Sequence, residues 1–187
     1  MLVVSPKSSG FTLIEVMVAV AIIAIGLTLG VPSYRTWVQN TQIRNAAESI
    51  QNGLQRARAE AVGRNTNVEF VLLGVDPDWV TSWQVRVVSA PVPPIDSRSG
   101  REGSKNVTGK GWAADDVTAA TTITFSSLAT VVNPTNADGS ATLRRIDLDS
   151  TVLNPADSRN LRVTVGLGGN VRMCDPNLAS GSSPQAC

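Results

Sequence analysis

Few residues of this sequence could do chemistry, and they lie near its two ends. Near the start, Glu15 is the only charged residue in the 21 residues from Phe11 to Val31. A carboxylate well inside a membrane helix costs about 2.5 to 3.5 kcal/mol even on lenient insertion scales, and such residues usually have a partner. Near the other end lie the only two cysteines, Cys174 and Cys187, and histidine is absent. The chain therefore offers no imidazole base or ligand, and Glu15 is the residue that most needs an explanation.

The two cysteines are expected to form a disulfide bond and not a metal site. They lie 13 residues apart in a polar tail rich in Ser, Gly and Pro, which is not a metal-site spacing. Two cysteines outside the membrane are expected to pair, and closing such a loop gains about 3 kcal/mol on the chain-entropy model. Asp147 and Asp149 would share one face of a strand, as calcium sites sometimes need, but a solvated strand face is the favoured interpretation. No metal or cofactor is predicted.

The apolar segment that holds Glu15 is expected to be a helix that the mature protein keeps. A secretory signal peptide has its cleavage site after its apolar run, whereas here the small residues Ser9 and Gly10 come before it. At a rise of about 1.5 Å per residue, residues 11–31 reach about 32 Å, and the hydrocarbon core of a bilayer is about 30 Å thick. The sequence therefore predicts a single membrane span.

The start of this segment also resembles a known signature. The run Gly10-Phe11-Thr12-Leu13-Ile14-Glu15 resembles the prepilin signature of type IV pilins and type II secretion pseudopilins. The resemblance implies a class III leader, residues 1–10 with Lys7 as its cytoplasmic charge, that a prepilin peptidase removes between Gly10 and Phe11 before it methylates the amino group of Phe11. It also implies an assembly charge pair between Glu15 and the amino group of a neighbouring subunit's Phe11. From the residues alone, Glu15 could instead be a carboxylate near the interface of an ordinary anchor.

The composition indicates one anchored domain of balanced charge. The 187 residues less the 10 of the leader leave 177, which suffices for an anchor helix and one compact domain. Without Lys7 the count of Lys and Arg falls from 16 to 15, equal to the 15 Asp and Glu, so no overall attraction to nucleic acid is expected. Trp79, Trp83 and Trp112 are not interleaved with basic residues, so packing explains them better than base stacking.

After the anchor, the helix is expected to continue as an amphipathic half over residues 32–65. Its apolar stripe consists of Ile43, Ala46, Ala47, Ile50, Leu54, Ala57 and Ala61. The helix is expected to end between Gly63 and Asn67, because Gly and Asn suit a helix end. Pro32, with Gly26 and Gly30 before it, is expected to bend or locally melt the helix where it leaves the bilayer.

Residues 66–187 are expected to form a β-rich head, which gives an α+β fold in which the long helix packs on an antiparallel sheet. Strands are predicted at 68–72, 83–87 and 161–167, where apolar residues alternate, with weaker candidates at 121–125 and 143–148. A turn is predicted at 137–140. The stretch from Ala90 to Ala120, with its Pro, Gly and Ser residues and balanced charges, is interpreted as a solvated loop.

A second resemblance narrows the family. The run at 54–65, Leu-Gln-Arg-Ala-Arg-Ala-Glu-Ala-Val-Gly-Arg-Asn, followed by a strand and by a second strand that holds Trp83, is similar to the GspH/FimT group. Members of that group are minor pilins of type IV pili or minor pseudopilins of type II secretion. The resemblance covers residues 8–88 and returns at residues 168–176, which resemble the C-terminal segment of pilus-type members. It therefore favours a pilus over a secretion system.

Some members of the group bind DNA for natural transformation through a C-terminal Gly-Arg-x-Arg motif. This chain has Gly169-Asn170-Val171-Arg172, so Asn170 replaces one of the two arginines. A single phosphate contact gives weak, salt-sensitive binding. Arg159, Arg162 and Arg172 could still line one side of the strand end, but a solvated strand face with a closed tail is the favoured interpretation.

The sequence thus predicts a filament subunit and not an enzyme. The resemblance implies a minor pilin that helps to prime assembly of a type IV pilus, with a part in twitching motility and adhesion. It would reside in the bacterial inner membrane as a single-pass protein with a periplasmic head, and later in the pilus at the cell surface. Its expected partners are the prepilin peptidase, other minor and major pilins and the pilus assembly platform. Two alternatives stay open: a DNA-binding minor pilin of natural transformation, and a minor pseudopilin of a type II secretion system.

Overall fold

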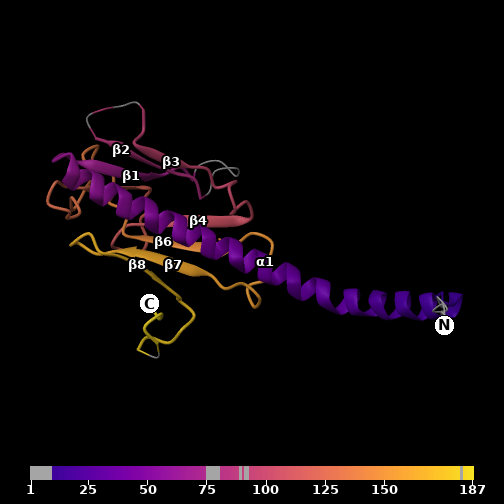
Figure 1. The fold of residues 1–187 in the computed structure, drawn as a ribbon. Coiled ribbons are helices and arrows are strands. Elements are labelled where there is room, and N and C mark those ends of the chain that lie inside the picture. The colour runs from indigo at the N-terminus through magenta and orange to yellow at the C-terminus, as the bar shows by residue number, and fades with distance from the viewer. Residues whose placement is uncertain (1–9, 75–80, 89, 91–92, 182) are drawn as a thin grey trace, which may run out of the picture. The chain divides into compact units, whose positions relative to one another are not determined.

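The fold consists of one helix followed by eight strands within the residues that the computed structural model describes, which are 10–74, 81–88, 90, 93–181 and 183–187 (Figure 1). The helix α1 is Leu13–Gly63. The strands are β1 (Val68–Leu72), β2 (Trp83–Val87), β3 (Asp96–Arg98), β4 (Val107–Trp112), β5 (Thr122–Phe125), β6 (Arg145–Ser150), β7 (Leu161–Val165) and β8 (Val171–Cys174). The chain divides between Trp37 and Val38 into two units, which are described separately. Residues 1–9 of the expected leader, and Trp79, lie outside the described residues.

In the first unit, helix α1 continues through Pro32 without interruption. Proline removes one N–H donor from the helix ladder, but the turns on both sides of Pro32 keep their helical geometry. The hydroxyl of Thr36 donates a hydrogen bond of 3.3 Å to the carbonyl oxygen of Pro32. The helix therefore does not melt at Pro32, and the bend expected there as the alternative stays a prediction.

In the second unit, the remaining part of α1 packs on the sheets through the predicted apolar stripe. Every residue of that stripe is at most 1% exposed. Gly53 lies on the same half of the helix, and a Cβ atom there would lie 2.9 Å from Phe70 and 3.0 Å from Trp83. Glycine thus lets the helix approach β1 and β2 closely, and the indole N–H of Trp83 donates to the hydroxyl of Ser49 over 2.9 Å. The helix ends at Gly63, as predicted.

The head has two antiparallel sheets where the sequence predicted one. Their strand orders are β3-β2-β1-β5 and β4-β6-β7-β8, and every strand pair in both is antiparallel. Phe70 of β1 lies opposite Val85 of β2 and Ile123 of β5, and Ile146 of β6 lies opposite Val163 of β7. The buried residues of both sheets and of α1 form a single core cluster. The α+β class with a long helix on antiparallel strands is confirmed.

The loop predicted between Ala90 and Ala120 is the main error, because it contains β3 and β4. Strand β3 is a short, fully exposed strand at the edge of its sheet, so it has no apolar alternation to detect. In β4, a Cβ atom on Gly111 would lie 2.1 Å from the carbonyl oxygen of Ala120. The strand therefore requires glycine at that close approach, and this glycine hides the strand pattern.

Smaller corrections concern the end of the chain. The strand predicted at 161–167 ends at Val165, and Leu167 lies in a turn with 57% of its surface exposed. No strand is predicted at the position of β8, where Val171 and Met173 pack against the core. The weaker predictions at 121–125 and 143–148 correspond to β5 and β6.

Candidate functional site

The first candidate site is the segment that precedes α1. Gly10 and Phe11 are exposed, and 83% of Phe11 is accessible to solvent. A Cβ atom on Gly10 would meet nothing within 4 Å. The described fold therefore gives no reason for glycine at this position, so a requirement for it would have to come from a partner such as a processing enzyme.

Glu15 lies in the first turn of α1 and forms a reciprocal capping arrangement with Thr12. The backbone N–H of Glu15 donates to the hydroxyl of Thr12 over 3.3 Å, and the backbone N–H of Thr12 donates to the carboxylate of Glu15 over 3.5 Å. This is the Thr-x-x-Glu capping box, which satisfies two backbone donors that have no partner in the helix ladder. Glu15 thus has a role in its own helix, and its carboxylate is held at the positive end of the helix dipole.

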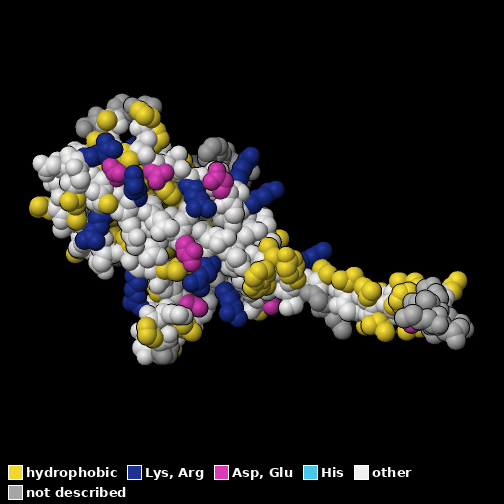
Figure 2. Space-filling view, in the orientation of Figure 1, with side chains coloured by type: hydrophobic (Ala, Val, Ile, Leu, Met, Phe, Trp, Pro, Cys, Tyr) yellow, Lys and Arg dark blue, Asp and Glu magenta, His cyan; other side chains and the backbone are white. Residues whose placement is uncertain are grey.

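The apolar side chains that follow Glu15 have no cover within the described unit. The large apolar residues from Leu13 to Leu27 are between 51% and 77% exposed. Figure 2 shows hydrophobic side chains gathered along this part of α1. By length and composition, the helix is apolar enough to cross a membrane.

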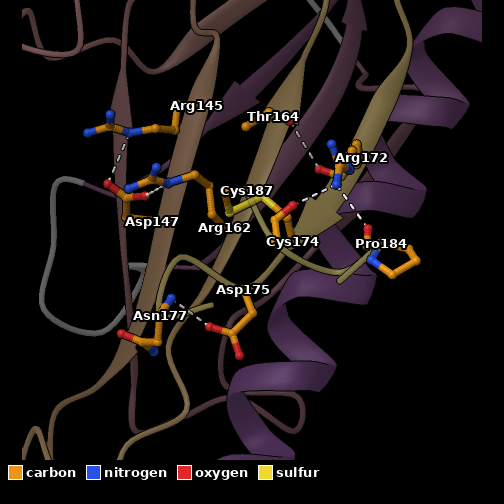
Figure 3. The surroundings of a disulfide bond; sticks show 11 residues. Arg145, Asp147, Arg162, Thr164, Arg172, Cys174, Asp175, Asn177, Pro184 and Cys187 are labelled. Carbon is orange, nitrogen blue, oxygen red and sulfur yellow. Dashed lines mark hydrogen bonds and ion pairs between the residues drawn. A yellow bond between two sulfur atoms is a disulfide. The ribbon is translucent and has the colours of Figure 1, made fainter. Parts of the chain in front are cut away.

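The second candidate site is the C-terminal end of the head, where Cys174 of β8 and Cys187 form a disulfide bond (Figure 3). The tail also pairs with the residue after β8: the N–H of Asp175 donates to Gln185 over 2.7 Å, and the N–H of Cys187 donates to Asp175 over 3.3 Å. Ala186 is 3% exposed. The tail therefore lies folded against the end of β8.

The structure brings two of the three predicted arginines together. Arg162 and Arg172 line one open trough on the second sheet, whereas Arg159 lines a separate cavity of about 260 Å³ with Asn40 and Met173. In Figure 3, Arg162 points toward Asp147, to which its Nε donates over 2.7 Å, and Arg172 points toward the tail. Nη2 of Arg172 donates to the carbonyl oxygens of Pro184, at 2.9 Å, and Ala186, at 2.6 Å.

Of the residues that resemble the DNA-binding motif, Gly169 and Asn170 lie in the turn between β7 and β8, and Val171 and Arg172 begin β8. Gly169 has a φ of 76°, and a Cβ atom there would lie 2.2 Å from the carbonyl oxygen of Ala129, so the turn itself requires glycine. The side-chain oxygen of Asn170 would lie 2.0 Å from a Cβ atom on Gly166. In place of an arginine, Asn170 therefore packs closely over the turn.

Sequence reasoning missed three other arginines that position this region. Nε of Arg58, on α1, donates to the carbonyl oxygen of Ala129 over 3.0 Å, and its Nη2 donates to that of Gly168 over 3.3 Å. Arg144 and Arg145 line the same trough as Arg162 and Arg172. Alternation in β6 puts Arg145 on the outer face, but the pairing of strands that completes the cluster has no signal in the sequence.

The acidic pair considered for calcium is engaged by other side chains. Asp147 forms ion pairs with Arg162 and Arg145, and Asp149 accepts a hydrogen bond from Ser158. The described residues contain no group of three or more Asp, Glu, Cys or His side chains placed to hold a metal ion.

Two family models match this chain. The prokaryotic N-terminal methylation motif matches residues 5–31, and the type II transport protein GspH matches residues 46–169. The structure is also similar to two crystal forms of the type IV minor pilin FimU from Pseudomonas aeruginosa strain PAO1. One form has 19% sequence identity and a TM-score of 0.53, and the match covers 81% of this chain and 98% of FimU. The other has 20% identity and a TM-score of 0.49, with 77% and 98% coverage. The first form shows the same fold.

Proposed function

This chain belongs to the type II transport protein GspH family, and from that membership we propose that it is a minor pilin that helps to prime assembly of a type IV pilus. The family consists of pilin-like structural subunits, minor pilins and pseudopilins, that are not enzymes. Its members act through contacts with other pilins and with the pilus machinery. The finer assignment below rests on particular residues of this chain.

We propose that the chain is made with a leader that a prepilin peptidase removes between Gly10 and Phe11, after which the amino group of Phe11 is methylated. The match to the N-terminal methylation motif supports this. Gly10 supports it too, because the described fold has room for a side chain at this position and does not itself require glycine. The new amino group of Phe11 would then be available to pair with Glu15 of a neighbouring subunit.

The observation that carries the proposal is the exposure of the apolar half of α1. The large apolar side chains from Leu13 to Leu27 are between 51% and 77% exposed. Such a surface is unfavourable in water, so another apolar surface must cover it. A bilayer would cover it before assembly, with the head in the periplasm. The helices of other minor and major pilins would cover it in the filament, after the assembly platform has moved the subunit out of the inner membrane.

The choice of a pilus over a secretion system rests on the C-terminal end of the chain. Residues 168–176 resemble the pilus-type members of the group, and the matched crystal structure is of a type IV minor pilin. In a pilus the subunit would contribute to twitching motility and adhesion. A minor pseudopilin of type II secretion is the rival that shares the same fold.

DNA binding is the other rival, and the side chains of two of the three predicted arginines have partners in this structure. Arg162 is paired with Asp147, and Arg172 is bonded to two carbonyl oxygens of the tail. We therefore expect the head to bind DNA weakly and with a steep salt dependence, if at all.

A clean deletion strain and its complemented strain separate the three candidates, through the amount of surface pilin sheared from each and through their enzyme export and transformation. A large drop in surface pilin that complementation restores is the expected result. Unchanged pili with lost export of secreted enzymes would assign the chain to type II secretion instead. Unchanged pili with a loss of transformation would assign it to DNA uptake.

A further inference from the structure

The outer face of the second sheet carries a trough lined by arginines. Filament assembly through α1 does not explain this feature. The trough has a volume of about 330 Å³, and Arg144, Arg145, Arg162 and Arg172 line it. Arg145 of β6 lies opposite Thr164 of β7, which in turn lies opposite Arg172 of β8. The positive side chains therefore lie across three neighbouring strands.

The side chains in and around the trough carry more positive than negative charge. Arg145 pairs with Asp116 at 2.6 Å and with Asp147 at 3.1 Å, and Arg162 also pairs with Asp147. Nε of Arg144 donates to the carbonyl oxygen of Val165 over 2.6 Å, and Arg172 bonds only carbonyl oxygens of the tail among the described residues. Counted over side chains, four guanidinium groups face two carboxylates, and Arg144 and Arg172 are the two that form no ion pair with a side-chain carboxylate among the described residues.

Both of these guanidinium groups keep donors for a ligand. A guanidinium carries five N–H donors. The hydrogen bonds that the guanidinium of Arg144 donates use Nε, and those of Arg172 use Nη2. At Arg144, Nη1 and Nη2 can together donate to one carboxylate in the two-bond geometry that arginine favours. At Arg172, Nε and Nη1 can each donate a single hydrogen bond.

The tail forms one wall of the trough. Cys174 and Cys187 both line it, and Figure 3 shows the disulfide between Arg162 and Arg172. Arg172 holds the tail through Pro184 and Ala186. The disulfide thus fixes the shape of the trough and the orientation of Arg172 together.

We propose that this trough binds acidic side chains of a protein partner, with a carboxylate held by Arg144 and Arg172. The identification of that partner as another pilin subunit rests on the proposed function. A nucleic acid would present an unbroken row of phosphates, and Asp116 and Asp147, which lie among the arginines, would repel it. Separate carboxylates on a peptide can approach the arginines without crossing these acidic groups.

The test is the binding of a fluorescein-labelled hexaglutamate peptide to the full chain in detergent, followed by fluorescence anisotropy. We expect Arg144→Gln and Arg172→Gln each to weaken binding by about tenfold, because each removes one charge-assisted contact. Arg56→Gln is the matched control, because Arg56 pairs with Glu60 on α1 and does not line the trough. Reduction of the disulfide should weaken binding by the wild-type chain as well.

Arg144→Gln leaves the contacts of the tail in place, so it tests the site even if Arg172→Gln releases the tail. Equal affinity in wild type and Arg144→Gln would overturn the proposal, as would an equal loss in Arg56→Gln. Displacement of the labelled peptide by a DNA duplex, at a lower concentration of negative charge than unlabelled hexaglutamate needs, would assign the trough to nucleic acid. That result would also overturn the proposal. A chain that restores surface pili but binds no peptide would overturn this inference and leave the proposed function standing.

Discussion

The two halves of helix α1 differ in what covers their apolar side chains. In the first half, the large apolar residues from Leu13 to Leu27 are at least 51% exposed, whereas in the second half the stripe from Ile43 to Ala61 is at most 1% exposed. One continuous helix therefore serves two environments. The second half stabilises the head within a single subunit, whereas the first half has no cover among the described residues of its own unit.

The glycines show the same difference. A side chain at Gly53 would meet Phe70 and Trp83, so the packing of the head requires glycine there, whereas a side chain at Gly10 would meet nothing. The fold of the subunit does not require glycine at position 10, so a requirement for it would come from a partner. Substitutions in the first half should accordingly change processing and assembly, and those in the second half should change stability.

The largest expected effect is that of Gly10→Leu. We expect processing to stop completely, because the peptidase would no longer accept the residue before the cut. The mass of the chain extracted from membranes should then include the leader. Unfolding of the head should be unchanged. Normal cleavage of Gly10→Leu would show that the glycine has no role in processing.

Glu15→Ala comes next, because it removes the proposed charge pair together with the capping contact to Thr12, and it removes no apolar surface. Breaking a buried pair by deleting one partner costs about 3–5 kcal/mol, so recruitment into pili should fall by an order of magnitude or more while membrane insertion persists. The ratio of pilus-bound to membrane-bound chain measures this. Glu48→Ala is the control, because Glu48 is an exposed carboxylate on the second half and pairs with Arg44. Normal incorporation of Glu15→Ala would count against the charge-pair mechanism.

Leu54→Ala should act on the head alone. Leu54 is fully buried in the core, so its truncation should lower the free energy of unfolding by about 2–5 kcal/mol. Urea unfolding followed by tryptophan fluorescence measures this, since Trp83 lies in the same core. Leu27→Ala is the matched control in the first half, where it should leave that free energy unchanged. A similar loss in both variants would mean that the halves are not independent.

The sequence predicts the second half of the helix well because its pattern follows directly from burial. The stripe from Ile43 to Ala61 and the helix end at Gly63 both agree with the structure. Strands were recognised where apolar residues alternate, as in β1, β2 and β7, and were missed in β3, β4 and β8. Strand β4 contains Gly111, which its close contact with Ala120 requires, and β3 is an exposed edge strand.

The candidate sites divide in the same way. Glu15 and the cysteines stand out in the sequence because each breaks a local compositional pattern. The arginine trough does not, because it depends on the register that sets Arg145 opposite Thr164 and Thr164 opposite Arg172. Arg159 lies near Arg162 in sequence but lines another cavity. Proximity in sequence was therefore a poor guide to this cluster.

Cys187→Ser tests how far the tail contributes to the head. Opening the loop between Cys174 and Cys187 should lower the free energy of unfolding by about 3 kcal/mol on the chain-entropy model. The core of α1 and the two sheets does not include the tail, so the head should still fold. Mass spectrometry without reductant should show the bond in wild type, and urea unfolding gives the loss. If Cys187→Ser failed to fold, or lost as much free energy of unfolding as a core variant such as Leu54→Ala, the tail would belong to the core.

The smallest expected effect is that of Asp138→Ala, in a turn far in sequence from both halves of α1. The hydroxyl and the backbone N–H of Ser140 donate to the carboxylate of Asp138 over 2.6 and 2.9 Å, and these bonds hold the pKa of that carboxyl below its usual value of 3.8. Because the pKa is lower in the folded chain, the contribution to stability is present above pH 3.8 and is lost as the pH falls through the folded-state pKa. The side chain is exposed, so the difference from wild type at pH 7 should be less than about 1 kcal/mol. Urea unfolding at pH 7 and at pH 3 should show that difference shrinking. A larger loss of unfolding free energy, or one that does not change with pH, would mean that the turn supports the head by packing. The stability of the head would then be less concentrated between α1 and the sheets than the burial pattern indicates.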